Sequence, residues 1–228
     1  MKTIGLVGGT GWVSTMEYYR LINQLMNQKK GGLHAARMMI YSVNYGEIDA
    51  MNQKNDQLSV MLTLKHTALK LEAAGADCLL LGANTSHQYA DDIQQALKIP
   101  LIHIGEETAS VVSNTGLQRV GLLGTKYTME MDFYKEKLNE KSIDVLVPEE
   151  DDRSFIHHCI TNELLVNQFL PESKRRFLTI IEKLRVVGAE GIILGCTEIP
   201  LLINQQDCTI PLFNTTEIHA KAAVEFAY

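Results

Sequence analysis

The sequence predicts an α/β fold of two similar lobes, each built around a parallel sheet. Short apolar runs alternate along the chain with longer stretches whose apolar residues recur at intervals of three and four. Strands that are apolar throughout and separated by helices are typical of buried parallel strands joined by right-handed crossovers. One segment near residue 70 is also repeated near residue 183, which indicates that the second lobe duplicates the first.

The repeat pairs residues 70–85, KLEAAGADCLLLGANT, with residues 183–198, KLRVVGAEGIILGCTE. Gly75 matches Gly188, Gly82 matches Gly195, and most apolar positions match at the same offset. At the end of the apolar run, however, the first copy has Ala83 and the second has Cys196. A duplicated unit with a thiol at one strand end suggests a site built between the two halves. Further matches outside this segment are 4–10 with 120–126 and 99–108 with 210–218.

The order of elements follows from the alternation of short and long patterns. We expect strands at 4–7, 38–43, 78–82, 101–104, 119–124, 143–147, 191–195 and 211–213. We expect helices between them at 14–28, 57–74, 86–97, 127–140, 171–187 and 215–227. No stretch rich in glycine and serine separates the halves, so the lobes should pack closely. The predicted lobes are 1–98 with 209–228, and 99–208, and the last helix returns to the first lobe.

Composition and charge restrict the possible partners. The 228 residues carry a net charge of −6, which argues against nucleic acid or an anionic membrane because both are bound by clustered Lys and Arg. No apolar run approaches the roughly 20 residues of a membrane span. The chain starts directly with a strand-like run, so we expect no signal peptide. The four cysteines lack C-x-x-C spacing, which favours a reducing cytoplasm.

Small polar side chains gather where the predicted strands end. Ligands of open parallel sheets bind beyond the carboxyl ends of the strands, and the free N–H groups of the helices that follow suit a carboxylate. Thr and Ser are also ordinary helix N-caps, and capping is the commoner role for any one of them. Their collection at both sheets favours a site. The residues are Thr10, Asn84, Thr85, Ser86, Thr125, Thr128, Thr197, Asn214, Thr215 and Thr216.

Glycine and histidine motifs do not indicate a nucleotide or a metal. The segment 8–11 lacks both G-x-G-x-x-G and the Gly-Lys-Ser/Thr of a phosphate loop, so we interpret it as a tight strand-to-helix turn. Adjacent His157 and His158 would diverge on a helix, so we expect no metal. His87 and His219 each follow a strand end, where a single histidine is more often a packing or capping residue.

Cys196 is the main candidate for chemistry. It stands at a strand end just before an expected helix start, a position that lowers the pKa of a thiol and exposes the thiolate. Cys78 lies within a strand and Cys159 on a helix, and both fit the commoner role of a small buried apolar residue. Glu198 could either act on the thiol or cap the helix, and the sequence leaves both roles open.

Four segments in order carry a family resemblance: GLVGGTGWVSTMEYYRLIN (5–23), GANTSH (82–87), ILGCTEIPLL (193–202) and PLFNTTEIHAKAAV (212–224). Together they resemble the aspartate/glutamate racemase superfamily, most closely its aspartate racemase branch. The resemblance implies two Rossmann-like lobes facing each other across a pseudo-twofold axis, with the active site in the cleft between them. It also implies an isomerase without pyridoxal phosphate or another cofactor, an amino-acid or dicarboxylate substrate, and a homodimer.

The resemblance further implies one cysteine from each lobe. One thiolate removes the α-proton and the other thiol returns a proton to the opposite face, as inversion requires. Fixed donors must stabilise the substrate carboxylate as negative charge develops on it. We assign Asn84, Thr85, Thr125 and Thr197 as these donors, Thr10 and Ser14 as the lining of the first lobe, and His87 and Glu198 as supporting residues.

The chain departs from the family pattern at Ala83, where the first cysteine belongs. Three explanations are open. The alanine is an engineered replacement; or it is natural, and water, Thr85 or Ser86 acts on that face of a slow or one-directional racemase; or the chemistry needs one thiol only. Asn214 also replaces a residue that is often acidic in the family. No cation in the matched motifs suits a distal carboxylate, so Arg37, Lys126 and Lys174 remain the candidates.

Two further functions fit a single cysteine. Relatives in the superfamily that decarboxylate malonates use one cysteine to protonate the carbanion left by the loss of carbon dioxide, which is a different reaction class. A non-catalytic amino-acid-binding protein would keep the cleft without turnover. Exchange of the α-proton distinguishes these from a racemase.

Overall fold

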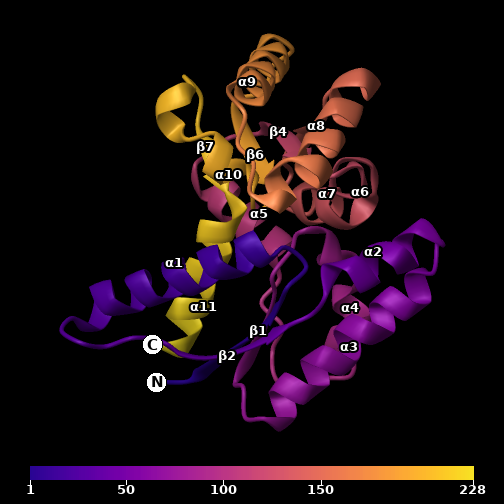
Figure 1. Ribbon diagram of the computed structural model, residues 1–228. Helices are drawn as coiled ribbons and strands as arrows, with labels where there is room; N and C mark the ends of the chain where they lie inside the picture. Colours follow the sequence, from indigo (N-terminus) through magenta and orange to yellow (C-terminus); the bar gives the residue numbers. More distant parts are fainter. The chain divides into compact units, whose positions relative to one another are not determined.

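The computed structural model describes all 228 residues, which form two compact units. Unit 1 comprises Met1–His103 and His219–Tyr228, and unit 2 comprises Ile104–Ile218. Both are built of parallel strands and helices, so the predicted α/β class is confirmed (Figure 1). None of the helices combines the length and the apolar character needed to cross a membrane.

Unit 1 contains a three-stranded parallel sheet in the order β2-β1-β3. Its strands are β1 (Thr3–Gly8), β2 (Arg37–Ser42) and β3 (Cys78–Leu81), and Leu101 adds an isolated parallel bridge to Leu79. Its helical segments are α1 (Trp12–Lys30), α2 (Tyr45–Gln53), α3 (Gln57–Ala73), the 3-10 turn η1 (Thr85–Tyr89) and α4 (Ala90–Gln94).

Helices cover both faces of β1 and β3. On one face, Tyr18, Ile22 and Met26 of α1 recur at helical spacing and pack with the C-terminal helix α11 (Thr215–Ala227). On the other face, Leu64 and Ala68 of α3 pack against β3. The continuous burial of β1 and β3 explains their uninterrupted apolar sequences.

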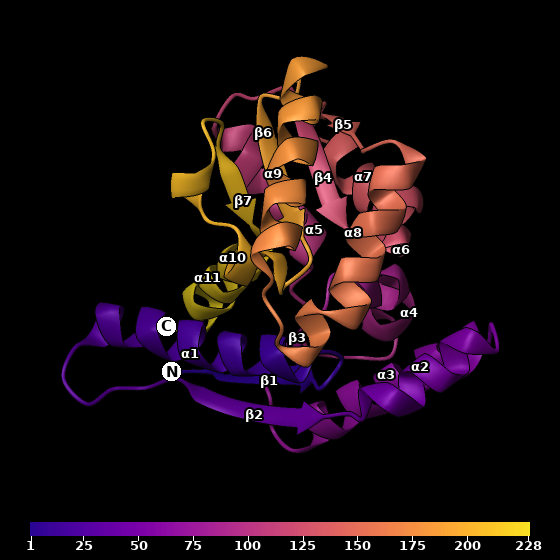
Figure 2. The same ribbon diagram turned by 45° about the horizontal axis from the view of Figure 1, so that its top comes forward.

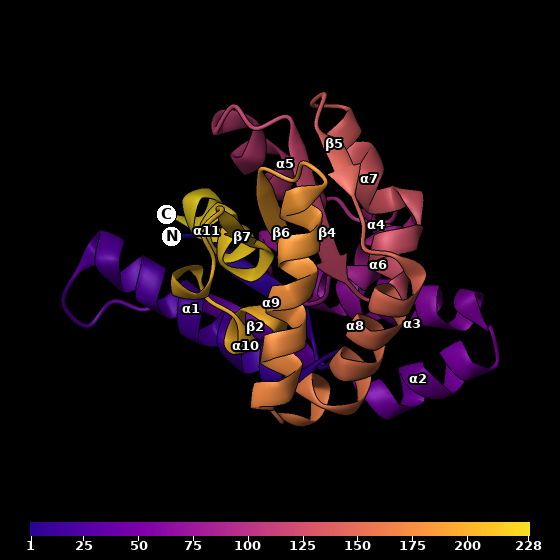
Figure 3. The ribbon, with the colours of Figure 1, turned by 90° about the horizontal axis from the view of Figure 1, so that it is seen from above.

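Unit 2 contains four parallel strands in the order β5-β4-β6-β7. They are β4 (Arg119–Gly124), β5 (Asp144–Leu146), β6 (Gly191–Gly195) and β7 (Leu212–Asn214). Helices α8, α9 and α10 pack on one face of the sheet and α5 and α7 on the other (Figure 3). The helical segments are α5 (Ile104–Asn114), α6 (Lys126–Glu130), α7 (Asp132–Asn139), α8 (Glu150–Asn162), η2 (Leu164–Val166), α9 (Pro171–Val186), α10 (Ile199–Leu202) and η3 (Gln205–Asp207).

Strand order supports the duplication inferred from the sequence. The order β2-β1-β3 of unit 1 recurs as β5-β4-β6 in unit 2, and the bridge at Leu101 takes the place of β7. The ends of both repeated apolar runs therefore lie at the carboxyl edge of their own sheets. This is the edge at which open parallel sheets bind ligands.

Several predicted elements differ in the structure. The expected strand 101–104 reduces to the bridge at Leu101, because α5 already begins at Ile104 with an acidic first turn that favours a helix start. The expected helix 127–140 divides into α6 and α7 at the extended Met131. The expected helix 86–97 forms only η1 and α4. Helices α2 and α5 were not predicted, and α8 was expected only as the helix that carries His157, His158 and Cys159, without bounds.

The boundaries between the two units differ by a few residues from the predicted lobe boundaries. Residues 100–102 stay with unit 1 because Leu79 donates to the Pro100 carbonyl and Ile102 donates to the Leu79 carbonyl. Residues 209–218 stay with unit 2 because β7 pairs with β6. The return to unit 1 therefore occurs within α11, at His219.

Candidate functional site

Cys196 is the first residue beyond β6. In the sheet register Gly195 of β6 is the partner of Gly124 of β4, so Cys196 and Thr125 leave neighbouring strands side by side. A Cβ added at Gly124 would lie 2.8 Å from the Gly195 carbonyl oxygen, so glycine permits this close approach. The sequence thus places the thiol at the edge of a rigid, buried strand pair.

The Cys196 thiol contacts a carboxylate. Its Sγ donates to Oε2 of Glu198 at 3.1 Å, and Oγ1 of Thr197 donates to the same oxygen at 2.9 Å. All three side chains are buried. Of the two roles left open for Glu198, the structure shows the contact with the thiol, because the side chain makes no capping bond to α10.

The expectation of a lowered thiol pKa at this position is wrong. Burial raises the pKa of the Cys196 thiol well above its ordinary value, and the charge of Glu198 raises it further. Hydrogen bonds from the backbone N–H groups of Glu198 and Ile199 oppose this but do not outweigh it. Helix α10 is only four residues long, too short to compensate for burial beside an anion. The thiol is therefore protonated at rest, next to an acceptor for its proton.

Thr125 and Lys126 stand beside the thiol segment on the next strand. The Thr125 hydroxyl accepts from the N–H of Thr128 at 3.3 Å and so caps α6, the commoner role expected for such residues. Lys126 follows directly and forms no ion pair, and its charge adds to burial in lowering the pKa of His157. Lys174, in contrast, pairs with Asp207 at 2.8 Å.

Arg37 stands apart from the other two cations considered for a distal carboxylate. It is the first residue of β2 and therefore lies at the amino edge of the unit 1 sheet, away from the strand ends. Lys174 is already paired with Asp207. Of the three cations, Lys126 therefore lies at the carboxyl edge of a sheet and also makes no ion pair.

The carboxyl edge of unit 1 begins with a tight turn after β1, as predicted. Gly9 has φ +82°, and an added Cβ would lie 2.1 Å from the Val43 carbonyl oxygen, so only glycine fits. The Thr15 hydroxyl accepts from the Gly9 N–H at 2.8 Å and fixes the turn. The turn leads into Thr10, whose buried Oγ1 has no hydrogen-bond partner. Such an atom is costly unless a ligand or water satisfies it.

Ala83 follows β3 on the neighbouring strand and is half-buried. Its carbonyl oxygen lies 3.0 Å from Nδ1 of His87. Because a carbonyl only accepts, Nδ1 carries the hydrogen and Nε2 is an acceptor, buried without a partner. Burial and the neighbouring His103 lower the pKa of His87 to about 3, so the ring is neutral at pH 7. Asn84 is buried and Thr85 is half-buried.

A cluster of histidines lies beneath this edge. The ring of His87 packs edge-on against His103 and His219, with centroids 4.8 and 5.5 Å away. Nε2 of His219 donates to the Ile102 carbonyl at 2.8 Å, so Nδ1 accepts from the Tyr18 hydroxyl at 2.7 Å. Burial, then the neighbouring His87, lowers the pKa of His219 to about 3. His219 is thus the packing residue that its isolated position suggested.

Two residues near these edges were not identified from the sequence patterns. Tyr18 and His103 join the histidine cluster, but a helical tyrosine and a histidine within an apolar run give no signal of it. Ser14 of α1, in contrast, was assigned to the lining and is fully buried. Asn214, noted as a departure from the family, accepts from the N–H groups of Thr216 and Glu217 and caps α11.

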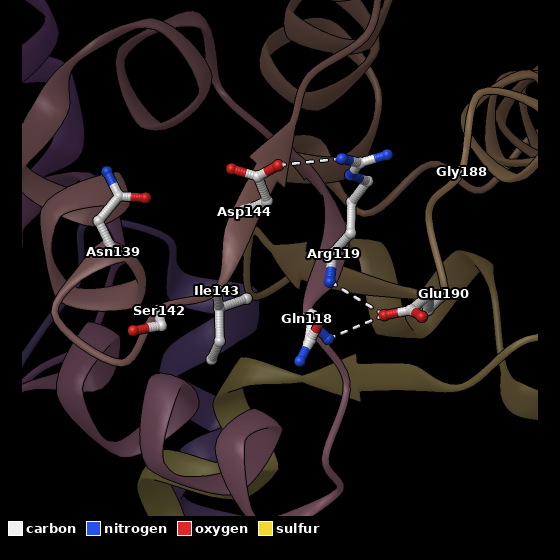
Figure 4. Close-up of a pocket in the computed structure, with 8 residues that line it drawn as sticks. All are labelled: Gln118, Arg119, Asn139, Ser142, Ile143, Asp144, Gly188 and Glu190. Atoms are coloured by element: carbon white, nitrogen blue, oxygen red, sulfur yellow. Dashed lines mark hydrogen bonds and ion pairs between the residues drawn. The ribbon is translucent and has the colours of Figure 1, made fainter.

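A cavity of about 470 Å³ opens at the opposite, amino edge of the unit 2 sheet (Figure 4). Its charged side chains already have partners within the protein. Arg119 pairs with Asp144 at 3.3 Å, and Glu190 accepts from the backbone N–H groups of Gln118 and Arg119. These contacts tie together the starts of three strands and lie away from Cys196. No group of three or more His, Cys, Asp or Glu side chains is arranged to hold a metal ion.

Comparison with known proteins assigns this arrangement to one family. The family model described as Asp/Glu/Hydantoin racemase matches residues 7–223. The broad specificity amino-acid racemase RacX of Bacillus subtilis is 25% identical over 224 residues, which cover 97% of this chain and 96% of that protein.

Solved structures extend the likeness over the whole chain. A candidate Asp/Glu racemase from Yersinia pestis is 43% identical with a TM-score of 0.91, covering 100% of this chain and 99% of that one. An aspartate racemase homologue from Pyrococcus horikoshii is 35% identical with a TM-score of 0.86 and the same coverage.

Proposed function

We propose that this chain, which belongs to the Asp/Glu/Hydantoin racemase family, is a cofactor-independent amino-acid racemase in which Cys196 exchanges the α-proton. Its relatives are racemases, a class of isomerase. The observation that carries the proposal is the buried Cys196 thiol, which donates a hydrogen bond to the Glu198 carboxylate at the carboxyl end of β6. A thiol with its own proton acceptor is equipped to alternate between acid and base.

The proton path begins at the resting thiol. Glu198 takes the proton of Cys196, and the resulting thiolate removes the α-proton of the substrate. The electron pair of the broken C–H bond moves into the substrate carboxylate, which gains enediolate character. Donors fixed at the strand ends stabilise that charge. We assign this role to Asn84, Thr85, Thr125 and Thr197, and we assign Thr10, with its unsatisfied hydroxyl, and Ser14 to the lining.

Residue 83 determines how a proton returns to the face of the substrate Cα opposite Cys196. Alanine has neither a proton to give nor a base to receive one, so water or a neighbouring hydroxyl, Thr85 or Ser86, must return the proton to that face. Such donors are weak acids and weaker bases than a thiolate. We therefore propose that turnover is slow and favours the direction in which the Cys196–Glu198 pair acts as the base. His87 supports this edge by fixing the Ala83 carbonyl.

The substrate side chain is proposed to be acidic. Lys126 follows Thr125 at the same sheet edge as Cys196 and is free of an ion pair, so it suits a second carboxylate. The nearby His157 is neutral, since burial and Lys126 both lower its pKa. An aspartate- or glutamate-like substrate fits this arrangement better than an apolar amino acid.

One observation favours a second function. The raised pKa of Cys196 keeps the thiol protonated, and Ala83 leaves a single acid/base group. A malonate-type decarboxylase needs only this: loss of carbon dioxide leaves an enediolate, and Cys196 protonates it. Glu198 is not required as a base in that reaction.

The two functions are separated by one set of assays. We expect chiral chromatography to detect the opposite enantiomer from L- or D-aspartate or glutamate, and Glu198→Gln to slow this roughly 100-fold or more, the usual range for losing a general base. Release of carbon dioxide from an arylmalonate, with no racemisation of any amino acid and little effect of Glu198→Gln, would assign the decarboxylase instead. Binding of an amino acid with neither reaction would leave a non-catalytic protein.

A further inference from the structure

A groove opens on unit 2 where the last turns of α9 lie beside the start of α8. The two helices run side by side on one face of the unit 2 sheet (Figure 2). The groove has a volume of about 780 Å³, within the roughly 300–1,000 Å³ of small-molecule sites. Its apolar lining includes Val147, Pro148, Leu178, Leu184, Val186 and Val187.

Contacts within unit 2 fix the walls of this groove. Asp152, in the first turn of α8, is buried and pairs with Lys183 of α9 at 2.6 Å. The Pro148 carbonyl accepts from Nη1 of Arg153 at 2.7 Å. Val147 packs against the core on both faces of the sheet. The groove is therefore preformed, as small-molecule sites usually are.

Apolar side chains of α9 remain accessible in the groove. Val186 and Val187, at the end of the helix, are 71% and 63% exposed. Leu178 lies two turns earlier on α9 and lines the same groove. Exposed apolar surface gathered in a recess is typical of a ligand-binding groove, because a ligand that covers it removes that surface from water.

The duplicated unit shows that folding does not require these apolar side chains. At the offset of the repeat, Lys65 of α3 corresponds to Leu178 of α9. Residues 73–74, both alanine, correspond to the valines at 186–187. Unit 1 thus builds the same strand order with a charged residue and two small residues at these places. The apolar surface is a property of unit 2 alone, which favours a role in binding over a role in packing.

Carboxylates predominate among the charged groups of the groove. Glu149, Asp152 and Glu182 line it, with Lys183 as the one cation. The ammonium group of Lys183 is already paired with Asp152, whereas Glu149 is exposed and forms no ion pair. A positively charged group on an apolar ligand is therefore favoured at this surface, and a negatively charged group is disfavoured.

We propose that this groove is a binding site for a small apolar amine. The hydrocarbon body of the ligand lies against Leu178, Val186 and Val187, and its ammonium group lies beside Glu149. A recess of this size suits a small molecule better than a protein partner, whose interface would extend over a larger surface. The site lies outside the proton transfer at Cys196, and the proposal does not depend on the proposed function.

The test is isothermal titration calorimetry of the full chain with phenylbutylamine, and with phenylbutyrate as the probe of opposite charge. We expect the amine to bind at least about 10-fold more tightly than the carboxylate. Leu178→Lys, which introduces the residue of unit 1, should weaken binding of the amine about 10-fold or more, and Glu149→Gln about 5-fold. Leu58→Lys is the matched control, because Leu58 is 64% exposed on α3 of unit 1 and should leave binding unchanged.

Two further measurements keep the result unambiguous. Far-UV circular dichroism identifies an unfolded variant, and Glu149→Gln, at an exposed position, retains the test if Leu178→Lys fails to fold. Sedimentation velocity should give the same mass for Leu178→Lys and the wild type, and a lower mass for the variant would show that a second copy covers the groove. That result, no binding of the amine, equal binding of both probes, or amine binding that both groove variants leave unchanged would overturn the proposal.

Discussion

At Cys196, local burial outweighs the influence of a helix start. The position at a strand end was expected to favour a thiolate, but the enclosed site and the Glu198 carboxylate keep the thiol protonated. Sequence patterns identify a strand end because that depends on neighbours along the chain. They do not reveal burial or a contact two residues away, because both depend on packing. The sequence therefore located the candidate group but misjudged its protonation state.

Ala83→Cys tests whether residue 83 is the empty partner position. A thiol there would supply the acid/base group that the opposite face lacks, so we expect racemisation of aspartate or glutamate to rise by about 100-fold or more. The measurement is the initial rate in both directions by chiral chromatography, with Ala73→Cys, at an exposed alanine ending α3, as the control for an added thiol outside the site. No gain with any amino acid would contradict the assignment of residue 83.

At the scale of elements, buried strands are predicted well and polar helices poorly. The limits of β4 and β6 match the expected runs, because strands buried on both faces are apolar throughout. Helix α2 was missed because it buries a single residue, Ile48, and so shows no apolar periodicity. Its local signals were the N-cap Asn44, which accepts from the Gly46 N–H, and Glu47 in the first turn.

The turn between β1 and α1 should require glycine at position 9 for stability. Gly9→Ala should destabilise the protein by more than about 2 kcal/mol, since it combines a left-handed backbone with a clash against the Val43 carbonyl. Gly116→Ala is the control, because Gly116 has φ +78° but open space around its Cα. We expect it to cost only about 1 kcal/mol. Urea denaturation of both variants measures the difference, and equal losses would show that the clash is absent.

At the scale of the whole molecule, duplication has given two sheets with different chemistry at their carboxyl edges. Unit 2 has a protonated thiol beside a carboxylate, and unit 1 has an alanine above a cluster of buried histidines, in which His87 and His219 are neutral at pH 7. The repeat and the order of elements were visible in the sequence. The histidine cluster was not, because Tyr18, His87, His103 and His219 come from four separate segments that only the fold brings together.

Because of the histidine cluster, the free energy of unfolding should decrease at acidic pH. His87 and His219 have pKa values of about 3 in the folded state, against an ordinary value of 6.5. Because the unfolded chain takes up these protons first, the stabilisation is complete above about pH 6.5 and is lost as the pH falls toward 3. The free energy of unfolding should fall by up to about 1.4 kcal/mol per pH unit for each histidine.

Urea denaturation between pH 7 and pH 5 measures this slope. His87→Gln should reduce it by the contribution of one histidine, whereas His34→Gln, at an exposed site, should not change it. The other ring facing the cluster is His103, and the Tyr18 hydroxyl is the remaining titratable group in contact. A slope that His87→Gln leaves unchanged would show that this ring can take up a proton in the folded state.

The role of Cys196 in proton transfer is tested by exchange of the substrate α-proton in deuterated water. We predict that the wild-type chain incorporates deuterium at Cα of aspartate or glutamate. Cys196→Ser should abolish this incorporation, and Cys208→Ser, at a partly exposed thiol outside the site, should leave it unchanged. Mass spectrometry gives the rate, and chiral separation shows whether inversion accompanies exchange. Exchange that persists in Cys196→Ser, or its absence from the wild type with every amino acid, would contradict the role of Cys196.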